Sequence, residues 1–122
     1  MVLTWLAAVN GGDVNDVLNL YGHNATLTPT FSPDLVGDRE GLNSYFIKLA
    51  SRPNFHVALH EETFKELQMS ARFSVATGLY SFTFDVDGAP KTSEARFTFI
   101  INLSSSNPIV YHHSSMLPSP PV

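Results

Sequence analysis

The spacing of hydrophobic residues predicts helices in the first half of the chain. Apolar positions recur at helical spacing in three segments, at 2–10, 14–21 and 39–50. Asp13 and Asp38 stand directly before the second and third segments, where an N-cap residue is expected. Gly22 follows the second segment and is placed like a residue that ends a helix. We therefore expect three helices, two of them with a defined start.

The second half of the chain alternates between apolar and polar residues with a period of two, which is typical of strands. The predicted strands cover 55–65, 69–85, 90–103 and 108–116. Asp87-Gly88 predicts a hairpin turn between the second and third of them, and Gly78 predicts a bulge within the second. A short strand over 25–31 contains Pro29, which places it at a sheet edge or at a bulge.

This order of elements predicts the fold class α+β. Helices collected in one half and antiparallel strands in the other favour a two-layer domain, with the helices on one face of the sheet. A long and strongly twisted sheet is expected to curl around the helices and to leave a cavity at its open end. We place a single domain at 1–117, followed by an extended Pro-rich tail at 118–122.

The composition narrows the possible partners. The 122 residues are 43% hydrophobic but only 15% charged, so part of the surface is expected to be covered by a partner subunit. The net charge of −4 and the lack of any basic run argue against nucleic acid or an anionic membrane as partner. Because the sequence contains no signal segment, no membrane-spanning run and no cysteine, we expect a cytoplasmic protein without disulfides.

Three motifs resemble one known fold family. Residues 35–46 (LVGDREGLNSYF) look like the start of its third helix, and 85–90 (DVDGAP) leading into 95–99 (ARFTF) look like its central hairpin. Residues 109–118 (IVYHHSSMLP) look like its last strand. The family is the nuclear-transport-factor-2-like superfamily, whose cystatin-like fold is a cone of three helices over a curled sheet. The branch it resembles contains the association domain of calcium/calmodulin-dependent protein kinase II and small stand-alone bacterial-type relatives called SnoaL-like.

The resemblance implies a homodimer and an interior pocket. Members of this family pair sheet on sheet, and their cone holds small molecules or, in some members, an active site. In the kinase association domain an arginine that matches Arg96 lines the cavity, and a second cavity arginine falls at Ser114 here. We expect no cofactor.

Arg96 is the main candidate for ligand binding. One face of the strand 90–103 carries Glu94, Arg96, Thr98 and Ile100, and the other carries Phe97, Phe99 and Ile101. We expect the first face to line the cavity and the second to contact a partner subunit. Arg96 would then hold a carboxylate of the ligand. Alternatively, it forms a structural ion pair with Glu94.

The last predicted strand supplies two further candidates. His112 and Ser114 share one face and are expected to join Arg96 in the cavity. His112 suits proton transfer near neutral pH, or it is a buried histidine held by hydrogen bonds. Trp5 and Tyr45 are aromatic residues with a polar group and are expected at the rim of the cavity.

His56 and His60 form an H-x-x-x-H motif, which suits a metal when it lies on a helix. In the predicted strand the two residues are about 13 Å apart. No metal site is therefore expected from this pair.

The sequence favours a homodimer with an interior pocket for a small organic molecule, with a carboxylate-bearing one as a candidate. Two alternatives stay open. One is a SnoaL-like enzyme of the isomerase, cyclase or dehydratase type, with His112 or Glu94 as its base. The other is an oligomerisation module whose pocket is vestigial. An interior filled by side chains, or Arg96 in solvent, would favour the oligomerisation module.

Overall fold

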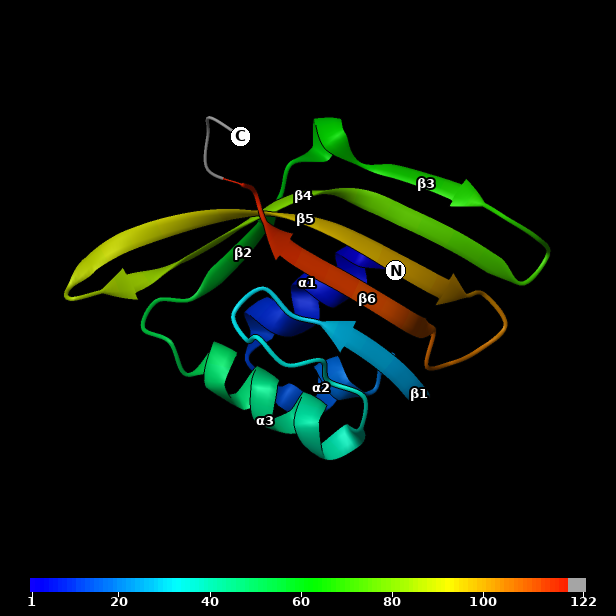
Figure 1. The fold of residues 1–122 in the computed structure, drawn as a ribbon, viewed down its shortest axis with the longest axis horizontal. Coiled ribbons are helices and arrows are strands. Elements are labelled where there is room, and N and C mark those ends of the chain that lie inside the picture. Colours follow the sequence, from blue (N-terminus) through cyan, green and yellow to red (C-terminus); the bar gives the residue numbers. More distant parts are fainter. Residues whose placement is uncertain (119–122) are drawn as a thin grey trace.

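The computed structural model describes residues 1–118 and shows three α-helices against one sheet (Figure 1). The helices are α1 (Val2–Gly11), α2 (Val14–Leu18), α3 (Arg39–Ala50) and the short 3₁₀ helix η1 (Glu61–Thr63). The strands are β1 (Tyr21–Thr28), β2 (His56–Leu59), β3 (Lys65–Gln68), β4 (Phe73–Val86), β5 (Ala89–Asn102) and β6 (Ile109–Met116). The sheet has the order β1-β6-β5-β4-β2, and β3 also pairs with β4. Residues 119–122, most of the tail expected at 118–122, lie outside the described residues.

The predicted α+β arrangement of two layers is confirmed. All three α-helices lie on the same side of the sheet, and buried residues of α1, α2 and α3 join those of the strands in one core. Within residues 1–118, no helix has both the length and the apolar character that a membrane crossing requires.

The two predicted helix starts are also confirmed. The Asp13 carboxylate accepts a hydrogen bond from the Asn15 N–H at 2.9 Å. The Asp38 carboxylate accepts one from the Gly41 N–H at 2.7 Å. Each bond satisfies a backbone donor that the first turn of a helix leaves without a partner.

The second helix is shorter than predicted, because the chain enters β1 at Tyr21. Helix α2 ends at Leu18, and β1 runs parallel to β6 with Tyr21 beside Ile109. Gly22 is therefore a strand residue and not the end of a helix. A Cβ at Gly22 would lie 3.2 Å from the Ile109 carbonyl oxygen, so the glycine permits a close approach of two strands.

The predicted strand 55–65 is interrupted: it contains β2, η1 and only the first residue of β3, Lys65. At the break, the Leu79 N–H of β4 donates to the Thr63 side-chain hydroxyl at 2.9 Å. A side-chain oxygen thus takes the place of a backbone carbonyl of a neighbouring strand as the acceptor. The bulge predicted at Gly78 is wrong, because Gly78 pairs in regular register with Phe97. Packing explains this glycine: a Cβ there would lie 2.9 Å from the Phe97 ring.

Strands β4 and β5 form the long hairpin that Asp87-Gly88 predicts. Both residues have a positive φ, 53° and 81°, as the two central residues of a type I′ turn require. Pairing is unbroken from Val86 with Ala89 to the far end of β4. This hairpin fixes which side chains share each face of the sheet.

The sheet turns the opposite face toward the helices from the one we predicted. Phe97, Phe99 and Ile101 point into the core and are at most 2% exposed. The prediction that these three residues contact a partner subunit is therefore wrong. Arg96 and Glu94 lie on the outer face and are exposed. Alternation along β5 determines which residues share a face. The face with Phe97, Phe99 and Ile101 packs inward because its burial removes more apolar surface from water than burial of the opposite face would.

Replacing Phe99 by alanine should destabilise the fold of the single subunit. The Phe99 ring packs against Trp5 and His112, with centroid distances of 5.5 and 4.0 Å. Its loss should lower the free energy of unfolding by about 3–5 kcal/mol in urea denaturation. Thr98→Ala, on the outer face of the same strand, should cost less than about 1 kcal/mol. Equal losses would contradict the observed assignment of the two faces.

Candidate functional site

Hydrogen-bonded polar side chains run through the interior of the cone. They connect α1, three strands and the segment between β1 and α3. The members of this interior network are Trp5, Tyr21, His112, Tyr80, Ser114 and Thr30. All but Thr30 are at most 3% exposed, so their polar groups depend on one another for hydrogen bonds.

One half of the network leads from α1 to the imidazole ring. The Trp5 indole N–H donates to the Tyr21 hydroxyl at 3.0 Å, and the Tyr21 oxygen lies 2.7 Å from Nδ1 of His112. Because the Tyr21 oxygen already accepts the hydrogen bond from the Trp5 N–H, its own O–H is available to donate to Nδ1. Nδ1 is then the acceptor, and Nε2 carries the ring proton of a neutral His112.

The other half of the network leads from the imidazole ring through Tyr80 and Ser114 to Thr30. Nε2 of His112 lies 3.0 Å from the Tyr80 hydroxyl, and Tyr80 donates to Ser114 Oγ at 2.6 Å. Ser114 is in turn hydrogen-bonded to the Thr30 hydroxyl. From Trp5 to Tyr80, each donor therefore meets an acceptor when His112 is neutral, and both ring nitrogens already have a hydrogen-bond partner within the protein.

Burial holds His112 in this neutral form. Removal from water lowers the pKa of His112 to about 3, and the neighbouring His113 adds a smaller effect of the same sign. Burial also raises the pKa of Tyr21 and of Tyr80 well above that of free tyrosine, so both hydroxyls keep their protons. A protonated ring would point a second donor at Tyr21 and leave the Tyr21 proton without an acceptor.

The interior has almost no free space. The cavity beside the network has a volume of about 10 Å³, enough for about one water molecule. It is lined by Trp5, Leu27, Tyr45, Phe46, Leu49, Tyr80, Phe82, His112 and Ser114. The cone that we expected to hold an organic ligand is thus filled by side chains.

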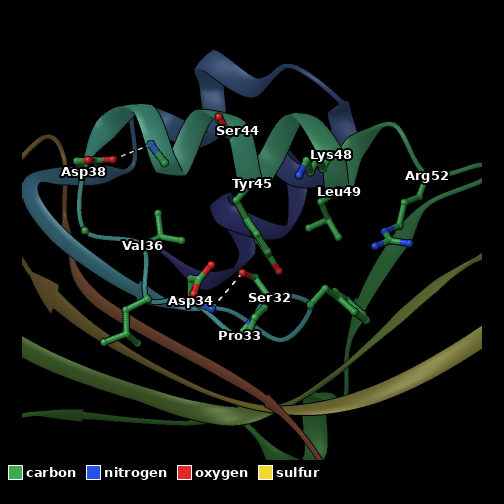
Figure 2. A pocket seen from close by; sticks show the side chains of 14 residues that line it. Ser32, Pro33, Asp34, Val36, Asp38, Ser44, Tyr45, Lys48, Leu49 and Arg52 are labelled. Carbon is green, nitrogen blue, oxygen red and sulfur yellow. Dashed lines mark hydrogen bonds between the residues drawn. The ribbon is translucent and has the colours of Figure 1, made fainter.

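A larger groove lies between α3 and the segment 31–38 (Figure 2). Its volume is about 560 Å³, which is within the usual range for small-molecule sites. Lys48 and Arg52 line it from the helix side and Asp34 from the segment, with Tyr45 reaching between the two walls. Burial raises the pKa of the Tyr45 hydroxyl to about 12, so Tyr45 presents a neutral hydroxyl.

Thr30 and Phe31 stand between this groove and the interior network. The Phe31 ring packs edge-on against Phe82 and Phe84, with centroids 5.3 and 5.6 Å away. Tyr45 lines both the groove and the small interior cavity. The segment after β1 therefore closes the mouth of the cone.

The structure brings together three of the five predicted ligand contacts. Trp5, His112 and Ser114 meet in the interior network, where Trp5 is buried and does not stand at a rim. Tyr45 lies beside them, at the boundary between cone and groove. These side chains serve one another as hydrogen-bond or packing partners, and their role toward a ligand stays a prediction.

The prediction that Arg96 lines the cavity is wrong. Arg96 is exposed on the outer face of β5, on the side of the sheet away from the helices. The candidate base Glu94 is exposed on the same face, so it does not reach the interior where His112 lies. The reason is the reversed orientation of the sheet, which moves every residue of this strand to the opposite side.

Four important residues are absent from the predicted site. They are Tyr21, Tyr80, Thr30 and Arg52. Tyr80 has a recognisable signal, since a tyrosine at an inward strand position needs a partner for its hydroxyl. Tyr21 had none, because its local pattern assigns it to a helix.

The described residues contain no group of three His, Asp or Glu side chains that could hold a metal ion. Nε2 of His60 lies 2.6 Å from the Ser81 hydroxyl, and His56 is exposed on β2. His60 thus has a protein hydrogen-bond partner of its own.

Solved structures of known fold are similar to this chain over nearly its whole length. A protein from Xanthomonas campestris, proposed to be a calcium/calmodulin-dependent protein kinase II association domain, is 28% identical with a TM-score of 0.86, covering 97% of this chain and 84% of that one. A ketosteroid isomerase-like protein from Erwinia carotovora atroseptica is 15% identical with a TM-score of 0.79, covering 97% and 92%. An NTF2-like protein with a cystatin-like fold from Novosphingobium aromaticivorans is 9% identical with a TM-score of 0.77, covering 97% and 78%.

The chain therefore has the cone-shaped, cystatin-like fold of the nuclear-transport-factor-2-like superfamily, as its three motifs indicate. The similarity extends to the branch of the kinase association domain. No protein-family model and no curated protein matches the chain. At 15% and 9% identity, the other two structures establish the fold and not a shared chemistry.

The neutral, buried His112 predicts a stability that falls in mild acid. The folded pKa of His112 is about 3, whereas an unfolded histidine has a pKa of about 6.5. Between these values the unfolded chain binds a proton that the folded chain does not. This contribution to stability is complete above about pH 6.5 and is lost toward pH 3, by about 1.4 kcal/mol for each pH unit.

Urea denaturation at about pH 6 and pH 4 measures this loss. His112→Gln removes the titrating group, so its free energy of unfolding should change less between the two pH values than that of the wild type. His23→Gln, at an exposed position of β1, is the control and should keep the wild-type pH dependence. An identical pH dependence in wild type and His112→Gln would refute a strongly lowered pKa.

Proposed function

We propose that this protein is a homodimeric assembly module whose outer sheet face pairs with the same face of a second copy. The observation that carries the proposal is a filled cone beneath a sheet whose outer face is mostly uncharged. Half-buried residues of this outer face include Val75, Thr77, Leu79, Thr98, Ile100, Tyr111 and His113. Methyl groups, hydroxyls and aromatic rings dominate it, which is the composition expected of a surface that packs against another.

The charges on this face favour pairing with itself. Glu94 and Arg96 lie two residues apart on β5, one acid and one base. In a twofold dimer the same patch occurs on both sides of the interface, so Arg96 of one copy can meet Glu94 of the other. The outer face is thus electrically complementary to a second copy of itself.

Hydrogen bonds along the sheet hold the polar side chains of this face in place. The Tyr111 hydroxyl lies 3.0 Å from the Thr28 hydroxyl and 3.2 Å from Nδ1 of His113. Nε2 of His113 lies 3.2 Å from Ser115 Oγ. Because these side chains are already ordered, pairing would cost less side-chain entropy than it would for free ones.

The interior of the cone supports the two other candidate functions, ligand binding and proton-transfer catalysis, less well than it supports the assembly role. Its cavity of about 10 Å³ has no room for an organic ligand. His112 has both ring nitrogens occupied by tyrosine hydroxyls, so it lacks the free lone pair of a base. The similarity to a protein that is proposed to be an association domain also supports the assembly role.

Light scattering on the purified chain tests the proposal. At micromolar concentration the wild type should show twice the chain mass of 13.4 kDa. Ile100→Asp places a carboxylate in the middle of the outer face, where pairing would remove it from water. This variant should therefore show the mass of one chain, with an unchanged circular dichroism spectrum.

Ile47→Asp is the matched control. It makes the same substitution on α3, where Ile47 is 50% exposed on the helical side of the molecule. This variant should keep the mass of the dimer. A monomeric wild type, or a dimeric Ile100→Asp protein, would refute the proposed interface.

A further inference from the structure

The groove between α3 and the segment 31–38 is positively charged at one end. Lys48 and Arg52 line it, and Figure 2 shows both residues toward the C-terminal end of α3. Within residues 1–118, no acidic side chain comes within the 4.0 Å of an ion pair with either of them. Two cations without an acidic partner on a concave surface attract an anionic ligand.

Two aromatic rings hold the Arg52 guanidinium group in place. Its central carbon lies 4.5 Å from the centroid of the Phe84 ring and 5.5 Å from that of Phe31. The Arg52 Nε is buried and takes no part in binding a ligand. The two terminal nitrogens, Nη1 and Nη2, are not buried and have no hydrogen-bond partner among residues 1–118, so both can donate to a group in the groove. Because the fork is already ordered, little side-chain entropy is lost when a carboxylate binds to it.

The two aspartates that line the groove lie away from its positive end. The Asp38 carboxylate accepts a hydrogen bond from Gly41 in the first turn of α3, and Lys48 lies about 15 Å further along by the rise of a helix. Asp34 is on the opposite wall, and Figure 2 shows it beneath the middle of α3. An anion held by Lys48 and Arg52 therefore does not displace an existing ion pair.

The remaining wall of the groove is apolar. Phe31, Pro33, Leu35 and Val36 line it, and Leu35 is 70% exposed. An apolar molecule in the groove would remove this surface from water. With a volume of about 560 Å³, the groove has room for one small organic molecule beside the two cations.

We propose that this groove binds a small monocarboxylate with an apolar body. The carboxylate accepts hydrogen bonds from Nη1 and Nη2 of Arg52 and faces the ammonium group of Lys48. The apolar body lies along Phe31, Leu35 and Val36. Asp34 contributes no contact to this ligand, and its charge disfavours a second carboxylate on the apolar body. The site is separate from the outer sheet face, so it stands or falls independently of the proposed dimer.

Three probes with the same phenyl body test the proposal by NMR titration. They are 3-phenylpropanoate, the neutral 3-phenylpropanamide and the cationic 3-phenylpropylamine. The backbone amide signals of Val36 and Arg52 report on the groove, and those of Thr98 and Ile100 report on the outer sheet face. In the groove, 3-phenylpropanoate should bind at least about tenfold more tightly than either of the other two. Equal binding of the carboxylate and the amide, or no shift of the groove signals with millimolar 3-phenylpropanoate, would overturn the proposal.

Single substitutions test which charged residues hold the carboxylate. Lys48→Met, at an exposed position, should weaken the binding of 3-phenylpropanoate about tenfold. Lys65→Met, at an exposed position of β3, is the matched control and should bind as the wild type does. Asp34→Asn should leave the affinity unchanged or raise it, because a like charge is removed. Wild-type affinity in Lys48→Met, or weaker binding in Asp34→Asn, would overturn the proposed contacts.

Arg52 requires two variants, because its side chain also packs on Phe31 and Phe84. A thermal melt shows whether each variant keeps the fold. A folded Arg52→Met protein should lose detectable binding of 3-phenylpropanoate. Arg52→Lys keeps the charge but not the planar fork, so it should bind about tenfold more weakly than the wild type even if Arg52→Met does not fold. Wild-type affinity in either folded variant would overturn the role of Arg52.

Discussion

The neutral imidazole of His112 between two tyrosine hydroxyls is the contact on which the rest of the structure depends. It joins residues that lie 91 and 32 positions away along the chain, Tyr21 and Tyr80. Both ring nitrogens are satisfied only when the ring is neutral and carries its proton on Nε2. The contact therefore ties β1, β4 and β6 to one another through buried side chains.

Because side chains fill the cone, the remaining candidate functional sites lie on the surface of the molecule. Trp5 and Tyr45 occupy space that a ligand would need, and Thr30 ties the segment after β1 across the mouth. Two surfaces remain that carry unsatisfied or uncovered groups. One is the outer face of the sheet, and the other is the groove beside α3. The same closed interior that stabilises the fold thus explains why neither surface involves His112.

The sequence predicts local features of this fold better than it predicts long-range ones. Asp13, Asp38 and the turn at Gly88 act on backbone within a few residues, so their roles could be predicted. The face of β5 could not, because Phe97 and its neighbours alternate identically whichever side the helices cover. The parallel pairing that places Tyr21 beside β6 likewise depends on residues far apart in sequence.

The same difference between local and long-range features applies to the candidate site. The alternation of β6 predicts that His112 and Ser114 point to one side, and both do point inward. Their hydroxyl partners come from other strands and from the segment after β1, so no spacing along β6 reveals them. The expected position of Arg96 depended on the choice of face and was wrong with it.

The imidazole nitrogen resonances of His112, observed by ¹⁵N NMR, test the central claim most directly. A buried ring held by two tyrosines should show an unprotonated Nδ1 and a protonated Nε2 whose proton exchanges slowly with water. The pattern should persist at about pH 5, where an exposed histidine is mostly protonated. A doubly protonated ring at that pH, or a proton on Nδ1 in place of Nε2, would contradict the interior network and with it the closed cone.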